Sequence, residues 1–427
     1  MLNITLQTTL DKSALLSTKA EDNFKLAVAI MPSDQIRTKF TQEGHAFNRG
    51  VDYCVVVDKT CDRLAEITEA IRALSLAIKH NDTLSLITYS DGPQVIMDSL
   101  TSIEAINKMK EITVIQGDSR NSNLYLGLKQ AREVMMSKDN ERIKKVLLIS
   151  GLRKSLNHAE EDMLNDEIEK YKQLNISIDT LGIGEESNLF VLDNIASVLG
   201  GQGHLVSTNT DISRIAIDSL QYCQNSILTN VKLKIRLNNK YFRLRHIYRG
   251  LPTNAYLGKG SGRDEIVINI NNMHIDKKQY YYFDIVSKIP KLGVEAPIDA
   301  AIIGVEYSIP SSSKRGEVMQ RKGQRLPIKF VIDESKIQVN HAFINVYSEA
   351  EIKRLESIMI DSKKKNEKEA VIYAYNQIIN ICQEIGNAKL ARDYKDSLEE
   401  YKRSNIIVTK ATNESSKSSI NDNLPIL

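Results

Sequence analysis

The chain has 427 residues, of which 57 are basic and 54 are acidic, so its formal net charge is only +3. This length allows about two to three domains, each large enough to bury its own hydrophobic core. A charge so close to balance gives no field strong enough to predict a nucleic-acid or membrane partner, and no apolar run approaches the roughly 20 residues that a membrane-spanning helix needs.

The cysteines and the first residues indicate a cellular compartment. Four cysteines lie far apart along the chain, without the paired spacing of a zinc site or the density of a disulfide scaffold. The opening stretch MLNITLQTTLDKS lacks the basic segment and the apolar core of a secretion signal. We therefore expect a cytoplasmic protein with reduced, buried thiols, and we expect neither a membrane nor a nucleic acid as its partner.

The N-terminal segment has the spacing of β-strands. Apolar residues alternate with others within LNITL and again within FKLAVAI. Strands that precede an α/β region have no parallel partner to join there, so they fit better in the β domain that follows it. We therefore expect residues 1–47 to complete a β-sandwich formed mainly by residues 226–347.

From residue 48 to residue 225, short β-branched runs alternate with longer amphipathic stretches. The runs are YCVVVD, TLSLITYS, KKVLLIS and ISIDTLGIG. Between them, apolar residues recur at helical spacing over 64–78 and near 101–111, 123–138, 158–173 and 188–199. Runs without polar alternation suit strands that are covered on both faces. We predict a Rossmann-like, doubly wound parallel sheet with helices on both sides.

From residue 226 to residue 347 the apolar period changes to two. The stretch NVKLKIRL places its apolar side chains on one face, and DEIVINI, YYYFDIVS, AAIIGVEYSI and LPIKFVI follow between turn signals. This pattern predicts an antiparallel β-sandwich.

Residues 348–405 are predicted to be helical. Two apolar stripes at helical spacing are separated by Gly386 and Asn387, which predicts a helical hairpin. Residues 406–427 are polar and rich in serine, so we expect a flexible tail. The whole chain is thus predicted to combine an α/β domain, an all-β domain and an α-helical segment.

Polar residues follow the first strand of the α/β region. In VVVDKTCDRL, Asp58, Thr60 and Asp62 come directly after a buried strand and before a helix. In a parallel α/β sheet, ligands bind beyond the carboxyl ends of the strands. Two interpretations are open: these side chains form such a site, or Thr60 or Asp62 caps the helix that follows.

Residues 48–220 resemble the von Willebrand factor A domain family. That family has the pattern D-x-S-x-S after its first strand, a threonine on a second loop and an aspartate after a later strand. Here Asp58 aligns with the leading aspartate, Thr60 with the first serine and Asp62 with the second serine, and Ser122 lies where the family has its threonine. NSNLYLGLKQA is similar to the family's threonine loop, and IDTLGIGEESNLFVLDNIASVLGGQGHLV is similar to its final strand, helix and glycine pair. The whole chain resembles bacterial proteins in which this domain is inserted in a β-sandwich that is followed by C-terminal helices.

The resemblance implies a metal site at the first strand, the metal-ion-dependent adhesion site of the family. Its ligands here would be Asp58, Thr60, Asp62 and Ser122, whose oxygen atoms are of the kind that Mg²⁺ prefers. Gly151 stands where the family usually has an aspartate. The resemblance therefore implies that Mg²⁺ binds weakly or not at all.

The resemblance also implies a protein-binding function without catalysis. A scaffold or interaction module of a bacterial cytosolic complex would bind another protein through the loops at 58–62, 119–123 and 150–153. The residues expected to contact that partner are Asp58, Thr60, Asp62, Ser119, Ser122, Asn123 and Arg153. The identity of the partner and the oligomeric state stay open.

The alternative is a hydrolase or a nucleotide-dependent enzyme that uses the same loops. Against it, the seven histidines show no H-E-x-x-H or comparable spacing, and the sequence contains no complete G-x-x-x-x-G-K-[ST] motif. Residues 311–325 are a further candidate, since they contain five basic side chains and one acidic one. They lack the aromatic residues that stack on bases, so a solvated hairpin loop is the simpler interpretation.

Overall fold

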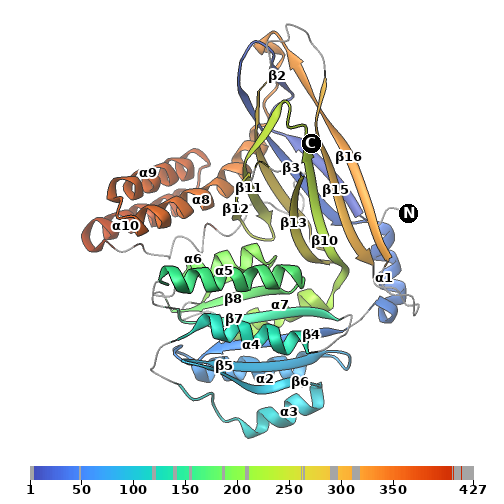
Figure 1. Cartoon of the computed structure of the whole chain (residues 1–427), viewed down its shortest axis with the longest axis vertical. Helices are drawn as coiled ribbons and strands as arrows, with labels where there is room; N and C mark the ends of the chain where they lie inside the picture. Colours follow the sequence, from blue (N-terminus) through green and yellow to red (C-terminus); the bar gives the residue numbers. More distant parts are fainter. Residues whose placement is uncertain are drawn as a thin grey trace.

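The chain folds into an α/β domain, a β-sandwich next to it and a group of C-terminal helices (Figure 1). The structure is a computed structural model. It describes residues 4–47, 50–117, 122–137, 142–152, 156–184, 188–206, 211–260, 262, 265–288, 297–309, 318–405, 407 and 415. The composite fold predicted from the sequence is confirmed.

The α/β domain is built on a six-stranded sheet with the order β6-β5-β4-β7-β8-β9. Its strands are β4 (Val51–Asp58), β5 (Thr83–Tyr89), β6 (Pro93–Leu100), β7 (Ile143–Ser150), β8 (Ser177–Ile183) and β9 (Gly203–Val206). β6 is antiparallel to β5, and the other neighbours are parallel. Every residue of β4 is buried, because this strand lies inside the sheet and is covered on both faces.

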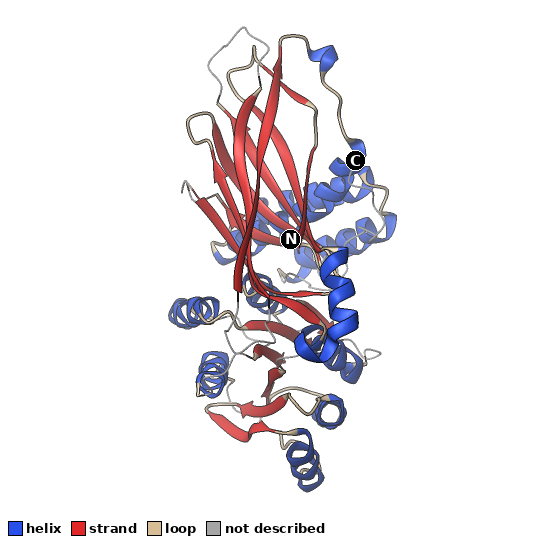
Figure 2. Cartoon of the chain, turned by 90° about the vertical axis from the view of Figure 1, so that its right-hand side faces the viewer, coloured by secondary structure: helices blue, strands red, loops and turns tan. Residues whose placement is uncertain are grey.

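Helices cover both faces of this sheet, as Figure 2 shows. On one face, α2 (Leu64–Ala77), α3 (Ser102–Glu111) and α7 (Ile212–Gln224) share a hydrophobic core with the strands. On the other face, α4 (Leu124–Met136), α5 (His158–Gln173) and α6 (Leu189–Val198) form a second core. The predicted doubly wound sheet is therefore present, with α7, β6 and β9 as elements that the sequence prediction did not include.

The β-sandwich consists of two five-stranded sheets that enclose one core. The first sheet contains, in spatial order, β1 (Ile4–Leu10), β3 (Asp22–Pro32), β14 (Gln279–Ser287), β11 (Phe242–Leu251) and β12 (Ala255–Lys259). The second contains β13 (Glu265–His274), β10 (Ser226–Leu237), β15 (Ile298–Ile309), β16 (Val318–Val331) and β2 (Ala14–Leu16). β3 pairs with β1 on one side and with β14 on the other, so N-terminal strands lie in a sheet whose remaining strands follow the α/β domain.

Two parts of the chain differ from the sequence prediction. The segment 1–47 was assigned to strands, but its last fourteen residues form α1 (Asp34–Phe47). The strand pairing ends at Pro32, and Ile36 of the helix then packs against the sandwich core. The helical part begins at His341 rather than at residue 348, so residues 341–347 belong to a helix and not to the sandwich.

The basic segment 311–325 is not simply a loop. Residues 318–325 belong to β16, while residues 311–317 lie outside the described residues. Within β16, Arg321 lies 3.0 Å from Glu306, and Arg325 lies 3.3 Å from Asp299 (N to O). These basic side chains are therefore paired across the sheet with acidic residues of β15.

Three helices follow the sandwich and the short 3-10 helix η1 (Glu334–Lys336): α8 (His341–Lys364), α9 (Lys368–Glu384) and α10 (Ala388–Ser404). α9 and α10 form the predicted hairpin, with Gly386 between them at a φ of 76°. α8 packs Phe343 and Tyr347 against Tyr248 and Tyr282 on the outer face of the first sandwich sheet. In the described part of the chain, no helix combines the length and apolar character needed to cross a bilayer.

Buried charges connect α8 to the α/β domain. Lys353 Nζ lies 3.0 Å from Glu356 Oε2 and 3.6 Å from Asp193 Oδ2, which belongs to α6. Glu356 also accepts hydrogen bonds from the Tyr394 hydroxyl and from the Ser415 hydroxyl, the latter at 3.0 Å. Ser415 is buried at this contact, and the rest of the predicted tail, apart from residue 407, lies outside the described residues.

Candidate functional site

The predicted site lies at the carboxyl edge of the α/β sheet. β4 ends at Asp58 and β7 ends at Ser150, and the two strands are parallel neighbours. The segment before α4 is held at the same edge, because the backbone N–H of Asn123 donates to the carbonyl oxygen of Ser90 at 2.8 Å. We call residues 58–62, 122–123 and 150–152 the loop rim.

Asp58 lies at the centre of the loop rim, and its carboxylate accepts four hydrogen bonds. Oδ1 accepts from the backbone N–H of Thr60 (2.9 Å) and from the Thr60 hydroxyl (2.7 Å). Oδ2 accepts from the hydroxyls of Ser122 (2.8 Å) and Ser150 (3.1 Å). Asp58 is fully buried, with 0% of its surface exposed. A buried carboxylate is stable only where donors of this kind replace water.

Ser150 extends this cluster into the core. Its hydroxyl donates to Asp58 and accepts from the Tyr89 hydroxyl (3.1 Å) and from the Leu152 N–H (3.2 Å). Burial, and after it the negative charge of Asp58, raises the pKa of Tyr89 well above its ordinary value, so Tyr89 keeps its proton and remains a donor. Ser150 belongs to the predicted loops but not to the predicted ligands. Its role depends on the pairing of β7 with β4, which the residues around it in the sequence do not reveal.

Helix capping does not account for Thr60. The N-cap of α2 is Arg63, which has a left-handed φ of 64° and makes no side-chain cap, whereas the Thr60 hydroxyl bonds to Asp58. On the second loop, Asn123 does cap a helix, because its Oδ1 accepts from the Leu126 N–H at 3.2 Å. Thr60 therefore belongs to the Asp58 cluster, and Asn123 fixes the start of α4.

The structure brings three of the four predicted metal ligands together: Thr60 and Ser122 both donate hydrogen bonds to Asp58. The fourth, Asp62, is exposed on the same loop as Thr60. Two residues predicted to contact a partner, Ser119 and Arg153, lie outside the described residues.

The oxygen atoms of the cluster suit a hard cation. In the part of the chain that the structure describes, no group of three or more His, Cys, Asp or Glu side chains is placed to hold a metal ion. The cluster instead combines one buried carboxylate with three hydroxyls. Such donors fit Mg²⁺ that retains several of its waters, and a single buried carboxylate fits weak binding.

Gly151 leaves space where the resemblance implies an aspartate. A Cβ atom at this position would lie 3.6 Å from both Cα and Sγ of Cys61, which is ordinary van der Waals contact. The backbone of Gly151 is also outside the left-handed region that favours glycine. A Cβ atom at position 151 would therefore fit beside Cys61 without displacing it.

Comparison with known proteins concerns the whole chain. No family model matches the sequence, and no curated protein sequence matches it. A solved structure of a von Willebrand factor type A protein from Catenulispora acidiphila is similar over 98% of this chain and 97% of its own, with a TM-score of 0.71 and 12% identity. The ArnB paralog VWA2 from Sulfolobus acidocaldarius is similar over 98% of this chain and 100% of its own, with a TM-score of 0.58 and 14% identity. The human COPII-coat protein Sec24c is similar over 79% of this chain and 51% of its own, with a TM-score of 0.50 and 9% identity.

At such low sequence identities, these structural similarities are evidence for a shared fold alone. The first two structures match nearly the whole chain, so the shared fold includes the β-sandwich and the C-terminal helices as well as the α/β domain. The resemblance first seen around VVVDKTCDRL is therefore confirmed for the fold: this chain has the fold of a von Willebrand factor A domain protein, with the α/β domain placed between strands of a β-sandwich and followed by helices.

Proposed function

We propose that this chain is a non-enzymatic interaction module, a scaffold in a bacterial cytoplasmic complex that binds a partner protein through the loop rim. The fold supports the proposal, because von Willebrand factor A domains serve widely as protein-interaction modules. The site supports it independently, because the rim lies at the carboxyl edge of an α/β sheet, where ligands of such sheets bind.

The observation that carries the proposal is the convergence of four hydrogen-bond donors on Asp58. The donors come from three separate segments of the chain. An apolar side chain at the end of β4 would need none of them, since a buried charge contributes less to stability than well-packed apolar groups do. We infer that the cluster is kept for binding rather than for folding.

We further propose that the rim binds Mg²⁺ weakly. Asp58, Thr60 and Ser122 would hold the ion, with water at its other positions. A bound ion would supply positive charge that attracts a carboxylate of the partner protein. Asp62, which is exposed, would add a second negative charge near the ion.

A pair of matched surface variants tests partner binding. Asp62→Ala removes an exposed acid of the rim, and Asp396→Ala removes an exposed acid of α10, which is not part of the rim. We expect a partner that co-purifies with the wild type in the presence of Mg²⁺ to be retained by Asp396→Ala and lost by Asp62→Ala, as measured by quantitative mass spectrometry. Equal co-purification with all three proteins would contradict the proposal.

A screen for turnover addresses the enzyme alternative. Purified wild-type protein is assayed for nucleotide hydrolysis and for phosphatase activity, together with Thr60→Ala. We expect no turnover above background from either protein. Turnover by the wild type that Thr60→Ala abolishes would show that the rim is catalytic and would overturn the scaffold proposal.

A further inference from the structure

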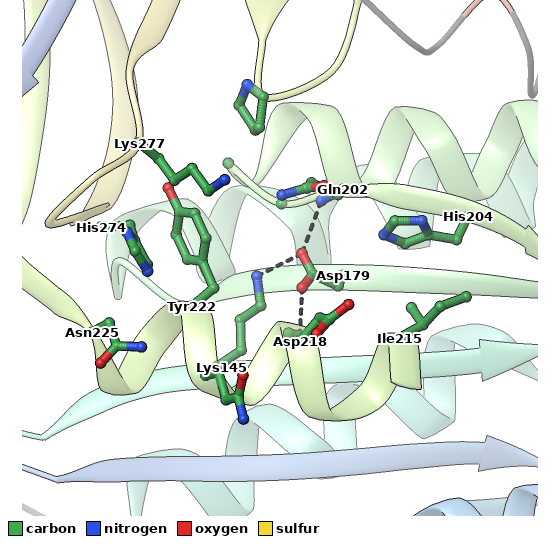
Figure 3. A pocket seen from close by; sticks show the side chains of 15 residues that line it. Lys145, Asp179, Gln202, His204, Ile215, Asp218, Tyr222, Asn225, His274 and Lys277 are labelled. Carbon is green, nitrogen blue, oxygen red and sulfur yellow. Dashed lines mark hydrogen bonds and ion pairs between the residues drawn. The ribbon is translucent and has the colours of Figure 1, made fainter. Parts of the chain in front are cut away.

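A polar cavity lies between the α/β domain and the β-sandwich (Figure 3). Its volume is about 420 Å³, within the size range of small-molecule sites. Lys145 comes from the start of β7, and Asn225 follows α7, whereas His274 and Lys277 belong to the sandwich. The cavity is thus at the amino edge of the α/β sheet, opposite to the loop rim.

One wall of the cavity is a buried ion pair. Lys145 Nζ lies 2.6 Å from Asp179 Oδ1, and the same carboxylate accepts from the backbone N–H of Gln202 (2.8 Å) and from the Ser219 hydroxyl. Burial opposes the ionisation of Asp179, but the Lys145 ammonium and these hydrogen bonds outweigh it and lower the pKa of Asp179. Lys145 and Asp179 neutralise each other, so neither is left to bind the charge of a ligand.

Gly201 lets the chain pass closely over this ion pair. A Cβ atom on Gly201 would lie 1.9 Å from the carbonyl oxygen of Ile178 and 2.6 Å from Asp179 Oδ1, so no other residue fits without a shift of the backbone. The close approach brings Gln202 to the cavity, and Figure 3 shows its side-chain amide pointing into it.

Several side chains at the cavity have hydrogen-bonding groups to spare. Within the described ranges, the side chains of Lys277, Gln202 and Asn225 make no hydrogen bond or ion pair. The Tyr222 hydroxyl accepts from the amide of Gln279 at 3.1 Å, which leaves its own hydrogen to be donated. These groups are solvated by water in the absence of a ligand, and a ligand that replaces the water must offer acceptors at least to Lys277 and Tyr222, since the amides of Gln202 and Asn225 can both donate and accept.

His274 adds a further donor. Its Nδ1 accepts from the backbone N–H of Asp276 at 3.0 Å, so the neutral ring carries its hydrogen on Nε2. Burial lowers the pKa of His274, which keeps the ring neutral near pH 7. The ring lies against Tyr222, with a centroid distance of 5.3 Å, so both groups border the same part of the cavity.

The charges around the cavity favour an anion. Lys277 is exposed, and its ammonium group forms no ion pair with a described acidic side chain. The cavity is also lined by Asp218, whose Oδ2 lies 3.8 Å from Arg214 Nε, so its charge is offset by that arginine. The uncompensated charge next to the donors is therefore the ammonium of Lys277.

We propose that this cavity binds a small metabolite through an oxyanion, a carboxylate or a phosphate group, held by Lys277 and by donors from Tyr222 and Asn225. Because Lys277 belongs to the sandwich and Asn225 to the α/β domain, the bound ligand contacts both domains. The proposal is independent of the loop rim, which lies at the other edge of the sheet.

Titration calorimetry at constant ionic strength tests the proposal with two probes, inorganic phosphate and succinate. The proteins are the wild type, Lys277→Met and the control Lys259→Met, which removes an exposed lysine of β12 outside the cavity. We expect one probe to bind the wild type and Lys259→Met equally, and to bind Lys277→Met at least ten-fold more weakly. Binding of phosphate alone identifies a phosphate group, and binding of succinate alone identifies a carboxylate.

Histidine NMR signals provide a second measurement that locates the bound probe. The ring signals of His274 should shift on addition of the probe, whereas those of His158, exposed at the start of α5, should not. Failure of both probes to bind, equal binding by Lys277→Met, or equal shifts of the two histidines would overturn the proposal.

Discussion

Asp58 is buried at the end of β4, and each of its two carboxylate oxygens accepts two hydrogen bonds. We expect Asp58→Asn to lower the free energy of unfolding by about 1–3 kcal/mol, because the new amide N–H groups would face hydroxyls and a charge-assisted network would be lost. Denaturant unfolding measures this change. Asp162→Asn, at an exposed position of α5, is the control and should change stability by less than about 0.5 kcal/mol. Equal effects of the two substitutions would contradict the role given to Asp58.

Asp179 should make stability depend on pH. Its pKa in the folded protein is lowered from an ordinary value of 3.8, because the Lys145 ammonium and hydrogen bonds outweigh burial. A carboxyl group with a lowered folded pKa stabilises the fold above its unfolded pKa, and this contribution is lost as the pH falls through the folded value. Asp179→Asn should therefore be less stable than the wild type at pH 7, and the difference should shrink below pH 3.8. Thermal unfolding between pH 7 and pH 3 checks this, and a difference independent of pH would argue against it.

The sequence was informative where a residue's role depends on its neighbours in the chain. Asp58 and Thr60 follow a recognisable buried strand, so their place at the sheet edge could be predicted. Ser150 and Lys277 could not be found in this way. Ser150 gains its role from the pairing of β7 with β4, and Lys277 from the contact between two domains.

Helix α8 depends on a buried cation for its contact with α6. Lys353→Met would leave Glu356, which is 2% exposed, without its ammonium partner. Breaking a buried ion pair from one side costs about 3–5 kcal/mol. We expect this substitution to lower the melting temperature more than Lys364→Met, which removes the contact of α8 with Glu161 at a more exposed site. Scanning calorimetry compares the two, and adding Glu356→Gln to Lys353→Met should restore part of the stability. A smaller effect of Lys353→Met than of Lys364→Met would contradict this role.

Whole elements were predictable where their apolar pattern was regular. The helices near 123–138 and 158–173 correspond to α4 and α5 within two residues. β6 was missed because it is a partly exposed edge strand without regular alternation. α7 was missed although Ile212, Ala216 and Leu220 have helical spacing and are buried. α1 was missed because it follows directly on β3 in a segment read as strands.

The N-terminal strands belong to the architecture of the whole molecule. β3 lies between β1 and β14 in the first sandwich sheet. A chain that begins at residue 48 lacks β1 and β3, so one edge of β14 and part of the sandwich core become open to other molecules. We expect this chain to aggregate in light scattering. Residues 50–225 alone are the control and should remain monomeric, because the α/β sheet takes no strand from the sandwich. A soluble, folded protein that begins at residue 48 would contradict the expectation.

The central claim is that the loop rim is a cation-assisted binding site built around Asp58. Its most direct test is titration calorimetry with Mg²⁺ on the wild type, Gly151→Asp and the neutral control Gly151→Asn. A Cβ atom at position 151 would make only ordinary van der Waals contact with Cys61, and a further carboxylate strengthens a hard-cation site. We expect weak binding by the wild type and by Gly151→Asn, binding at least ten-fold tighter by Gly151→Asp, and no binding once Asp58→Asn is added to Gly151→Asp. If Gly151→Asp binds Mg²⁺ no better than Gly151→Asn, the hydroxyls around Asp58 do not form a cation site and the claim is wrong.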